Sequence, residues 1–174
     1  MEANASSAQF DEFVRARTGS LLRSAYLLTG DQHLAEDLVQ SALVRTHRAW
    51  KRLHDTNNAE AYTRKTMYHL QVAWWRRKRF KETSDDGVSD SAVSIPDSSE
   101  ATVRKMVLRD ALAHLPPRQR AVIVLRFYED RTVPDTAEIL NCSTGTVKSQ
   151  TAKAISSLRK QRPELAQFTE RSFA

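Results

Sequence analysis

The sequence predicts an all-α protein built from two small helical domains that are joined by a flexible acidic linker. The 174 residues include only four glycines and five prolines, whereas the helix-favouring residues Ala, Leu, Arg and Glu are frequent. Residues 81–100 contain six serines and six acidic residues, a composition that buries too little surface to order itself. We therefore expect domains at residues 1–80 and 101–163, followed by a tail at 164–174.

Three helices are expected in the first domain, at about residues 7–29, 32–53 and 59–80, because apolar residues recur there at helical spacing. Gly30-Asp31 supplies a helix-ending glycine and an N-cap aspartate between the first two helices. The polar segment 54–58 is rich in turn-forming residues and separates the last two. The inner face of the second helix is expected to include Leu34, Leu38, Ala42 and Trp50.

The second domain is expected to contain four helices. The first begins near Glu100 and ends before Pro116-Pro117, because residues ahead of proline avoid helical geometry. The others are expected at about residues 118–128, 133–140 and 144–160. The last two meet through a turn of about three residues, as a helix-turn-helix requires.

The helix after this turn carries polar and basic residues in its N-terminal part, which suit phosphates and the base edges of the major groove. From the pattern alone, an ordinary helical hairpin with a polar outer face is an alternative. Cys142 in the turn is expected to be a small, half-buried apolar residue.

A second DNA-binding pattern ends the first domain, where Trp74-Trp75 precedes four consecutive cations at residues 76–79. Aromatic rings stack on bases and cations follow a phosphate backbone, so the pattern suits single-stranded or melting DNA. The alternative is a core tryptophan on a helix whose basic end is solvated.

Charge is divided unevenly along the chain. Residues 1–80 hold 13 Lys/Arg against 8 Asp/Glu, residues 81–100 hold 1 against 6, and residues 101–174 hold 13 against 7. Two basic lobes flanking an acidic connector favour a polyanionic partner.

Several classes of protein are disfavoured by the sequence. The single cysteine and five scattered histidines predict neither a disulfide nor a metal site, and no cofactor is expected. No run of apolar residues is long enough for a membrane span and the N-terminus lacks a signal-peptide core, so a cytoplasmic protein is expected. Adjacent acidic pairs in helices do not face each other, and the chain is not expected to be an enzyme.

Four stretches together resemble the extracytoplasmic-function (ECF) sigma factors of RNA polymerase, and more closely their SigE-like actinobacterial subgroup. Residues 31–50 resemble sigma regions 2.1–2.2, and residues 61–77 resemble regions 2.3–2.4. The stretch Leu115–Arg126 resembles region 4.1, and residues 136–149 resemble region 4.2.

The resemblance implies roles for three sets of residues. Contacts with the clamp helices of the polymerase β′ subunit are implied for Asp37, Leu38 and Gln40. Contacts with the promoter −10 element, including a base flipped from the stack, are implied for Asp55, Asn57, Asn58, His69, Trp74, Trp75, Arg76 and Arg77. Contacts with the −35 element are implied for Ser143, Thr144, Thr146, Lys148, Ser149, Gln150 and Lys153.

The implied partners are core RNA polymerase, through its β′ and β subunits, and promoter DNA, with an anti-sigma factor as a further candidate. The acidic linker would pass through the polymerase cleft. Two positions depart from the family's usual pattern: Gln150 begins a stretch that lacks the usual cations, and His69 stands where Asn is frequent. The alternative function is a dimeric helix-turn-helix repressor or activator, which would protect symmetric half-sites without polymerase.

Overall fold

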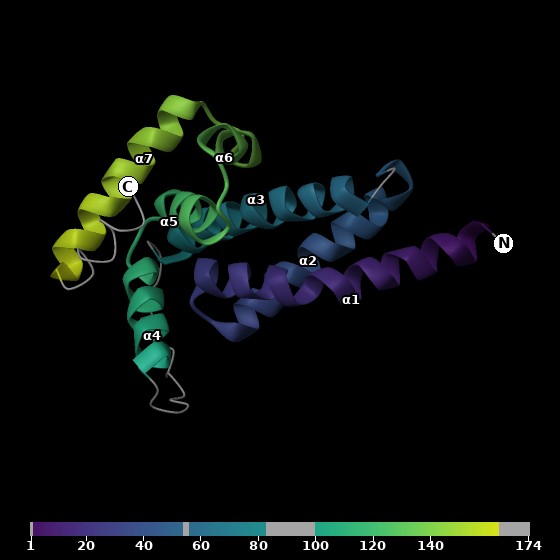
Figure 1. Ribbon diagram of the computed structural model, residues 1–174, viewed down its shortest axis with the longest axis horizontal. Helices are drawn as coiled ribbons and strands as arrows, with labels where there is room; N and C mark the ends of the chain where they lie inside the picture. The colour runs from purple at the N-terminus through teal and green to yellow at the C-terminus, as the bar shows by residue number, and fades with distance from the viewer. Residues whose placement is uncertain (1, 54–55, 83–99, 164–174) are drawn as a thin grey trace. The chain divides into compact units, whose positions relative to one another are not determined.

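Figure 1 presents the computed structural model, which describes residues 2–53, 56–82 and 100–163. Every regular element in these ranges is helical, so the predicted all-α class is confirmed. The elements are α1 (Glu2–Thr29), α2 (Gln32–Ala49), η1 (Trp50–Arg52), α3 (Thr56–Glu82), α4 (Glu100–Ala113), α5 (Pro117–Ile123), η2 (Val124–Tyr128), α6 (Val133–Leu140) and α7 (Thr144–Gln161).

The chain divides into two compact units, Met1–Gln71 and Val72–Ala174. Their boundary falls inside α3, ahead of the domain end expected at residue 80. Of the expected linker, residues 81 and 82 are the last residues of α3 and residue 100 begins α4. The rest of the linker, and the tail from residue 164, lie outside the described residues.

In the first unit, α1 and α2 pack against each other and are joined by the expected tight turn (Figure 1). Gly30 adopts a left-handed conformation with φ of 71°, which glycine reaches without steric cost. The carboxylate of Asp31 accepts a hydrogen bond of 2.9 Å from the backbone N–H of Leu34 and so caps α2. Both assignments made from the sequence are therefore confirmed.

Aromatic side chains close one end of the α1–α2 pair. The ring of Phe10 lies 4.7 Å from that of His47 and 5.1 Å from that of Trp50, centroid to centroid, with edge-on geometry. Phe13 is buried and lies 5.3 Å from Trp50. Such edge-on pairs add to the stabilisation that comes from burial alone.

The core of the first unit is made by residues from all three helices. The members with large side chains are Phe13, Leu21, Leu28, Leu38, Val39, Met67, Tyr68 and Leu70. The expectation that Leu34 belongs to the inner face is wrong, because 45% of its surface is exposed. Leu34 lies one turn before Leu38, at the edge of the buried stripe, where helical spacing alone does not decide burial.

The helix α3 begins at Thr56, three residues before the expected start. Asn57 and Asn58 therefore belong to its first turn rather than to a loop, and both side chains are exposed. The change matters for function, because a helical turn fixes the direction in which these two amides project.

In the second unit, the end of α4 is capped by a buried arginine. The guanidinium of Arg120 donates hydrogen bonds to the carbonyl oxygens of Ala113, at 2.8 Å, and Leu115, at 3.1 Å. Arg120 is only 1% exposed, and this burial lowers the pKa of its guanidinium to about 10. Arg120 still carries its charge at neutral pH and satisfies carbonyls that a helix end leaves without partners.

The helix expected at about 118–128 changes its geometry in its second half, where η2 is a π-helix. The N–H of Glu129 bonds to the carbonyl of Val124 at 2.9 Å, and the N–H of Arg131 bonds to that of Leu125 at 2.9 Å. Asp130 between them is left-handed, with φ of 57°. The widened turn ends the helix and leads the chain into α6.

The helices α6 and α7 form the predicted helix-turn-helix and pack against each other (Figure 1). A capping box joins Thr132 and Asp135 at the start of α6. Asn141 ends α6 in a left-handed conformation, with φ of 51°, and Ser143 caps α7. The buried contacts between α5, α6 and α7 come from Val122, Ala137 and Val147, against which Val133, Leu140 and Cys142 also pack.

Among the described residues, no helix has the length and apolar character of a membrane span. The same part of the chain contains no cluster of three or more His, Cys, Asp or Glu side chains that would suit a metal ion.

Candidate nucleic-acid interface

The N-terminal half of α7 presents a polar and basic face. The buried residues of the whole helix are Val147, Ala154 and Leu158, which form one stripe. The opposite side of α7 is therefore open to solvent. Of the residues predicted to contact the −35 element, the exposed ones are Ser143, Thr144, Lys148, Ser149 and Lys153. The half-buried ones are Thr146 and Gln150.

Two of these side chains also shape the helix start. The hydroxyl of Ser143 accepts a hydrogen bond of 3.1 Å from the N–H of Thr146, and the two hydroxyls lie 2.9 Å apart. Ser143 thus fixes the first turn, while Lys148 and Lys153 supply the positive charge that phosphates require.

A second polar line runs along α3. Asn58, Lys65, His69 and Arg76 are separated by seven, four and seven residues, a spacing that places all four on one side of a helix with 3.6 residues per turn. Asn58, His69 and Arg76 are exposed, and Lys65 is half-buried. We call these four residues the α3 line.

Sequence reasoning did not select Lys65, although its helical spacing from Asn58 and His69 indicates it once α3 is known to begin at Thr56. Asn57 and Arg77 flank the α3 line and are exposed. Asp55, the remaining member of the predicted −10 set from the loop, lies outside the described residues.

The two tryptophans near the end of α3 are both half-buried, so neither is a fully buried core residue. The ring of Trp75 is approached by the Lys78 ammonium, 5.8 Å from the ring centroid, and by the Arg120 guanidinium, 5.1 Å from it. Both cations lie within the distance at which an indole ring interacts with a cation.

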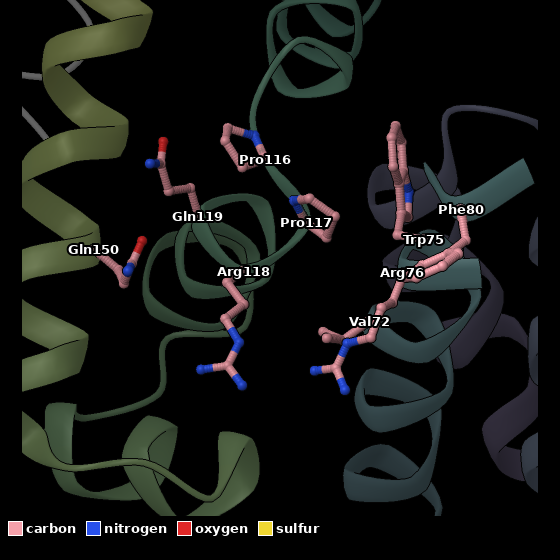
Figure 2. Close-up of a pocket in the computed structure, with 9 residues that line it drawn as sticks. All are labelled: Val72, Trp75, Arg76, Phe80, Pro116, Pro117, Arg118, Gln119 and Gln150. Carbon is pink, nitrogen blue, oxygen red and sulfur yellow. The ribbon is translucent and has the colours of Figure 1, made fainter. Parts of the chain in front are cut away.

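A cavity of about 730 Å³ lies in the second unit, and its lining includes Trp75, Arg76, Arg118 and Gln150 (Figure 2). Arg76 and Arg118 are exposed residues, and Figure 2 shows their guanidinium groups on facing sides of the same space. Two cations that face one space favour an anion between them, as a nucleic-acid phosphate would be. The cavity thus brings Trp75 and Arg76 together with Gln150 from the other predicted set.

The surface of α2 agrees only in part with the prediction for polymerase contact. Asp37 and Gln40 are exposed, but Leu38 is completely buried and belongs to the core. The prediction of a polymerase contact by the Leu38 side chain is therefore corrected. The exposed apolar side chains of this helix are instead Leu34, at 45%, and Val44, at 50%.

Comparison with known protein families accounts for both units. Residues 13–81 match the family Sigma-70 region 2, and residues 111–160 match the family Sigma-70, region 4. The RNA polymerase sigma-E factor of Streptomyces avermitilis is 40% identical over 153 residues, which are 88% of this chain and 84% of that protein. The ECF RNA polymerase sigma factor SigL of Mycobacterium tuberculosis is 32% identical, over 94% of this chain and 92% of that protein.

A solved structure also shares the fold. It is the complex of the sigma factor RpoE with the anti-sigma factor NepR from Bartonella quintana, whose matching chain has a TM-score of 0.72 and 24% sequence identity. The match covers 87% of this chain and 95% of the other. This structure shows the fold alone, whereas the family matches in both units and the Streptomyces and Mycobacterium relatives establish that the chain belongs to the ECF sigma factors, which are non-enzymatic proteins that direct RNA polymerase to promoters.

Proposed function

We propose that this sigma factor directs polymerase to promoters through three surfaces, each of which binds a different partner. The exposed face of α2 binds core polymerase, the α3 line with its flanking residues binds the −10 element, and the N-terminal half of α7 reads the −35 element. The corresponding functional segments are residues 1–80, a linker at 81–100, residues 101–163 and a tail at 164–174. The observation that carries this proposal is the α3 line, because a simple helix-turn-helix repressor has no use for it.

The α3 line suits melted DNA. Removing a base from the stack costs a few kcal/mol, so the protein must compensate with specific contacts. The amides of Asn57 and Asn58 each offer donors and an acceptor, and both are exposed in the first turn of α3. Further along the helix, Lys65, Arg76 and Arg77 provide charge for the phosphates, while Trp74 and Trp75 provide aromatic surface.

The face of α7 suits duplex DNA. A helix-turn-helix places the N-terminal part of its second helix in the major groove, where Thr144, Ser149 and Gln150 offer hydrogen bonds to base edges. The hydroxyls of Ser143 and Thr146 hold the first turn. Because Lys148 and Lys153 are the cations among the first ten residues of α7, they are assigned to phosphates.

The face of α2 suits a protein partner. Leu34 and Val44 are exposed apolar residues that alternate along α2 with the exposed polar residues Asp37 and Gln40, and protein interfaces combine apolar contacts with polar ones. We assign this face to the β′ subunit of core polymerase, and we assign further contacts of the chain to the β subunit. The cytoplasm, where polymerase acts, is the proposed location.

An anti-sigma factor is a further proposed partner. The Bartonella quintana protein that shares this fold was solved with the anti-sigma factor NepR, and a protein that covers both basic units would block both DNA contacts. The acidic linker is proposed to pass through the polymerase cleft. Neutralising its six acidic residues without any change in early transcription would exclude a role for that charge.

The division between the two DNA surfaces is tested with variant holoenzymes. Lys148→Ala is expected to weaken −35 binding at all sequences alike and to reduce the salt slope of binding by about one. Arg76→Ala with Arg77→Ala is expected to leave −35 protection intact and to reduce permanganate reactivity at the −10 element. If both variants lost only −35 protection, the assignment of α3 to melted DNA would be wrong. Symmetric half-sites protected by the chain without polymerase would favour the repressor function.

A further inference from the structure

A polar network connects the start of α3 to α1. One carboxylate oxygen of Glu60 lies 3.1 Å from Nε of Arg17 on α1, and the other lies 3.1 Å from Nη2 of Arg64 on the next turn of α3. Arg64 also donates to the hydroxyl of Ser20 on α1, at 3.4 Å. Each carboxylate oxygen of Glu60 is thus paired with a different guanidinium, and charge-assisted bonds of this kind are directional.

A second polar contact joins the same part of α3 to α2. The hydroxyls of Thr63 and Thr46 lie 2.8 Å apart, and both residues are fully buried. Each hydroxyl also lies within reach of a carbonyl of its own helix, Thr63 of Ala59 at 2.7 Å and Thr46 of Ala42 at 2.9 Å. Because a hydroxyl has one proton, one threonine donates to its own carbonyl and accepts the proton of the other threonine, which links α2 to α3 at this position.

Of these groups, Glu60 lies within one turn of Asn57 and Asn58, which are assigned to the −10 element. Asn57 and Asn58 precede Glu60 by three and two residues, about 3 to 5 Å along the helix axis. Helix ends open more readily than helix centres, and the first turn of α3 therefore depends on what holds the second. Apolar packing alone permits small rotations, whereas hydrogen-bonded networks specify one arrangement.

We propose that Glu60 is a positioning residue for −10 recognition. It fixes the first turn of α3 both in its rotation about the helix axis and in its position along that axis, so that Asn57 and Asn58 meet the unstacked base in one geometry. This inference rests on the proposed function of Asn57 and Asn58. Glu60 itself faces α1 rather than the DNA and acts only through the helix that it anchors. Recognition groups need to be held to within about 0.5 Å. A loosened first turn therefore reduces discrimination between bases at the −10 element before it reduces the stability of the fold.

The test measures base discrimination by the holoenzyme. Open-complex formation is compared between a promoter and its single-base substitutions at each −10 and −35 position. Glu60→Gln keeps the shape of the side chain but removes its charge. We expect discrimination at the base read by Asn57 and Asn58 to fall about tenfold, with the ratios at the −35 positions unchanged. Glu12→Gln removes an exposed carboxylate of α1 and is the matched control, with wild-type ratios expected.

Two further variants distinguish a loss of base discrimination from a folding defect. Arg17→Met breaks the same ion pair from its more exposed side, where the Arg17 side chain is 40% exposed, and it is expected to lower the same ratio. Arg17→Lys keeps the charge and is expected to retain a ratio close to that of the wild type. If Glu60→Gln and Arg17→Met reduced the rate of open-complex formation equally at every promoter, the ratios between the promoter and its single-base substitutions would be unchanged. The network would then only stabilise the fold, and the proposal would be overturned.

Asn58→Ala, tested in parallel, separates this inference from the proposed function. Loss of discrimination in Asn58→Ala with wild-type discrimination in Glu60→Gln and Arg17→Met would overturn the positioning role alone. Wild-type discrimination at every −10 base in Asn58→Ala and in Asn57→Ala would instead remove the proposed −10 function, and the positioning role with it.

Discussion

Individual residues show where a helical pattern decides burial and where it does not. Leu34 and Leu38 are one turn apart on α2 and were both expected to face inward, yet Leu34 is 45% exposed and Leu38 is buried. The sequence predicts the centre of an apolar stripe well, since several residues agree on it. The edge of the stripe depends on how α1 and α3 pack around α2, which the sequence of α2 does not contain.

The opposite environments of these two leucines predict opposite effects of substitution. Leu34→Asp is expected to weaken binding to core polymerase while leaving stability almost unchanged. Leu38→Ala is expected to lower the free energy of unfolding by about 2–5 kcal/mol, because it leaves a cavity in the core. Urea unfolding and a core-binding titration measure the two effects. Equal loss of stability in both variants would contradict the assignment of Leu34 to the surface.

Arg120 illustrates a residue whose role the sequence does not show. It belongs to a basic segment that resembles region 4.1, yet its guanidinium is buried and holds the carbonyls at the end of α4. Arg120→Met is expected to lower the free energy of unfolding by about 2–3 kcal/mol, because two carbonyls at the end of α4, one of them buried, lose a charged donor. Arg118→Met, at an exposed position two residues earlier, is the control for urea unfolding and should have little effect.

At the scale of elements, the helix-turn-helix was predicted most accurately. The bounds of α6 were correct because its ends are marked chemically, by Thr132 at one end and the Asn141 turn at the other. The π-helix η2 was not predicted, because its wide turn depends on bonds from Glu129 and Arg131 to carbonyls five and six residues earlier. No local propensity marks such bonds.

The turn between α6 and α7 depends on the left-handed residue Asn141. Asn141→Gly is expected to preserve the turn, because glycine adopts this conformation freely. Asn141→Val is expected to cost about 1–2 kcal/mol of stability, since a β-branched residue is strained there. Thermal unfolding of both variants compares them. A stable Asn141→Val variant with normal −35 binding would show that the turn tolerates another conformation.

The capping box of α6 predicts a dependence on acid. The hydrogen bond from the Thr132 hydroxyl, above all, lowers the pKa of Asp135 below its ordinary value of 3.8. A carboxylate with a lowered pKa in the folded state stabilises that state above its ordinary pKa, and the stabilisation is lost as the pH falls through the lowered value. Asp135→Asn should therefore flatten part of the stability loss below pH 3.8. An unchanged acid-unfolding curve would argue against the capping role.

For the whole molecule, the sequence predicted two helical bodies, yet the compact units meet inside α3 rather than at residue 80. The reason is that a helix continues past the end of the core that supports it. Thr63, Met67 and Gln71 are buried with the first unit, and the aromatic and basic residues that follow extend beyond it. Composition marks where a helix stops, whereas the limit of a packed unit depends on its neighbours in space.

The central claim is that this chain gives core polymerase its choice of promoter through two separate DNA-binding surfaces. The most direct measurement reconstitutes the chain with sigma-free core polymerase on a promoter library and maps the transcript starts. The account predicts defined starts that share two upstream elements, with Lys148→Ala weakening the upstream one and Arg76→Ala with Arg77→Ala impairing opening at the downstream one. Failure to bind core polymerase, with no defined starts, would contradict it.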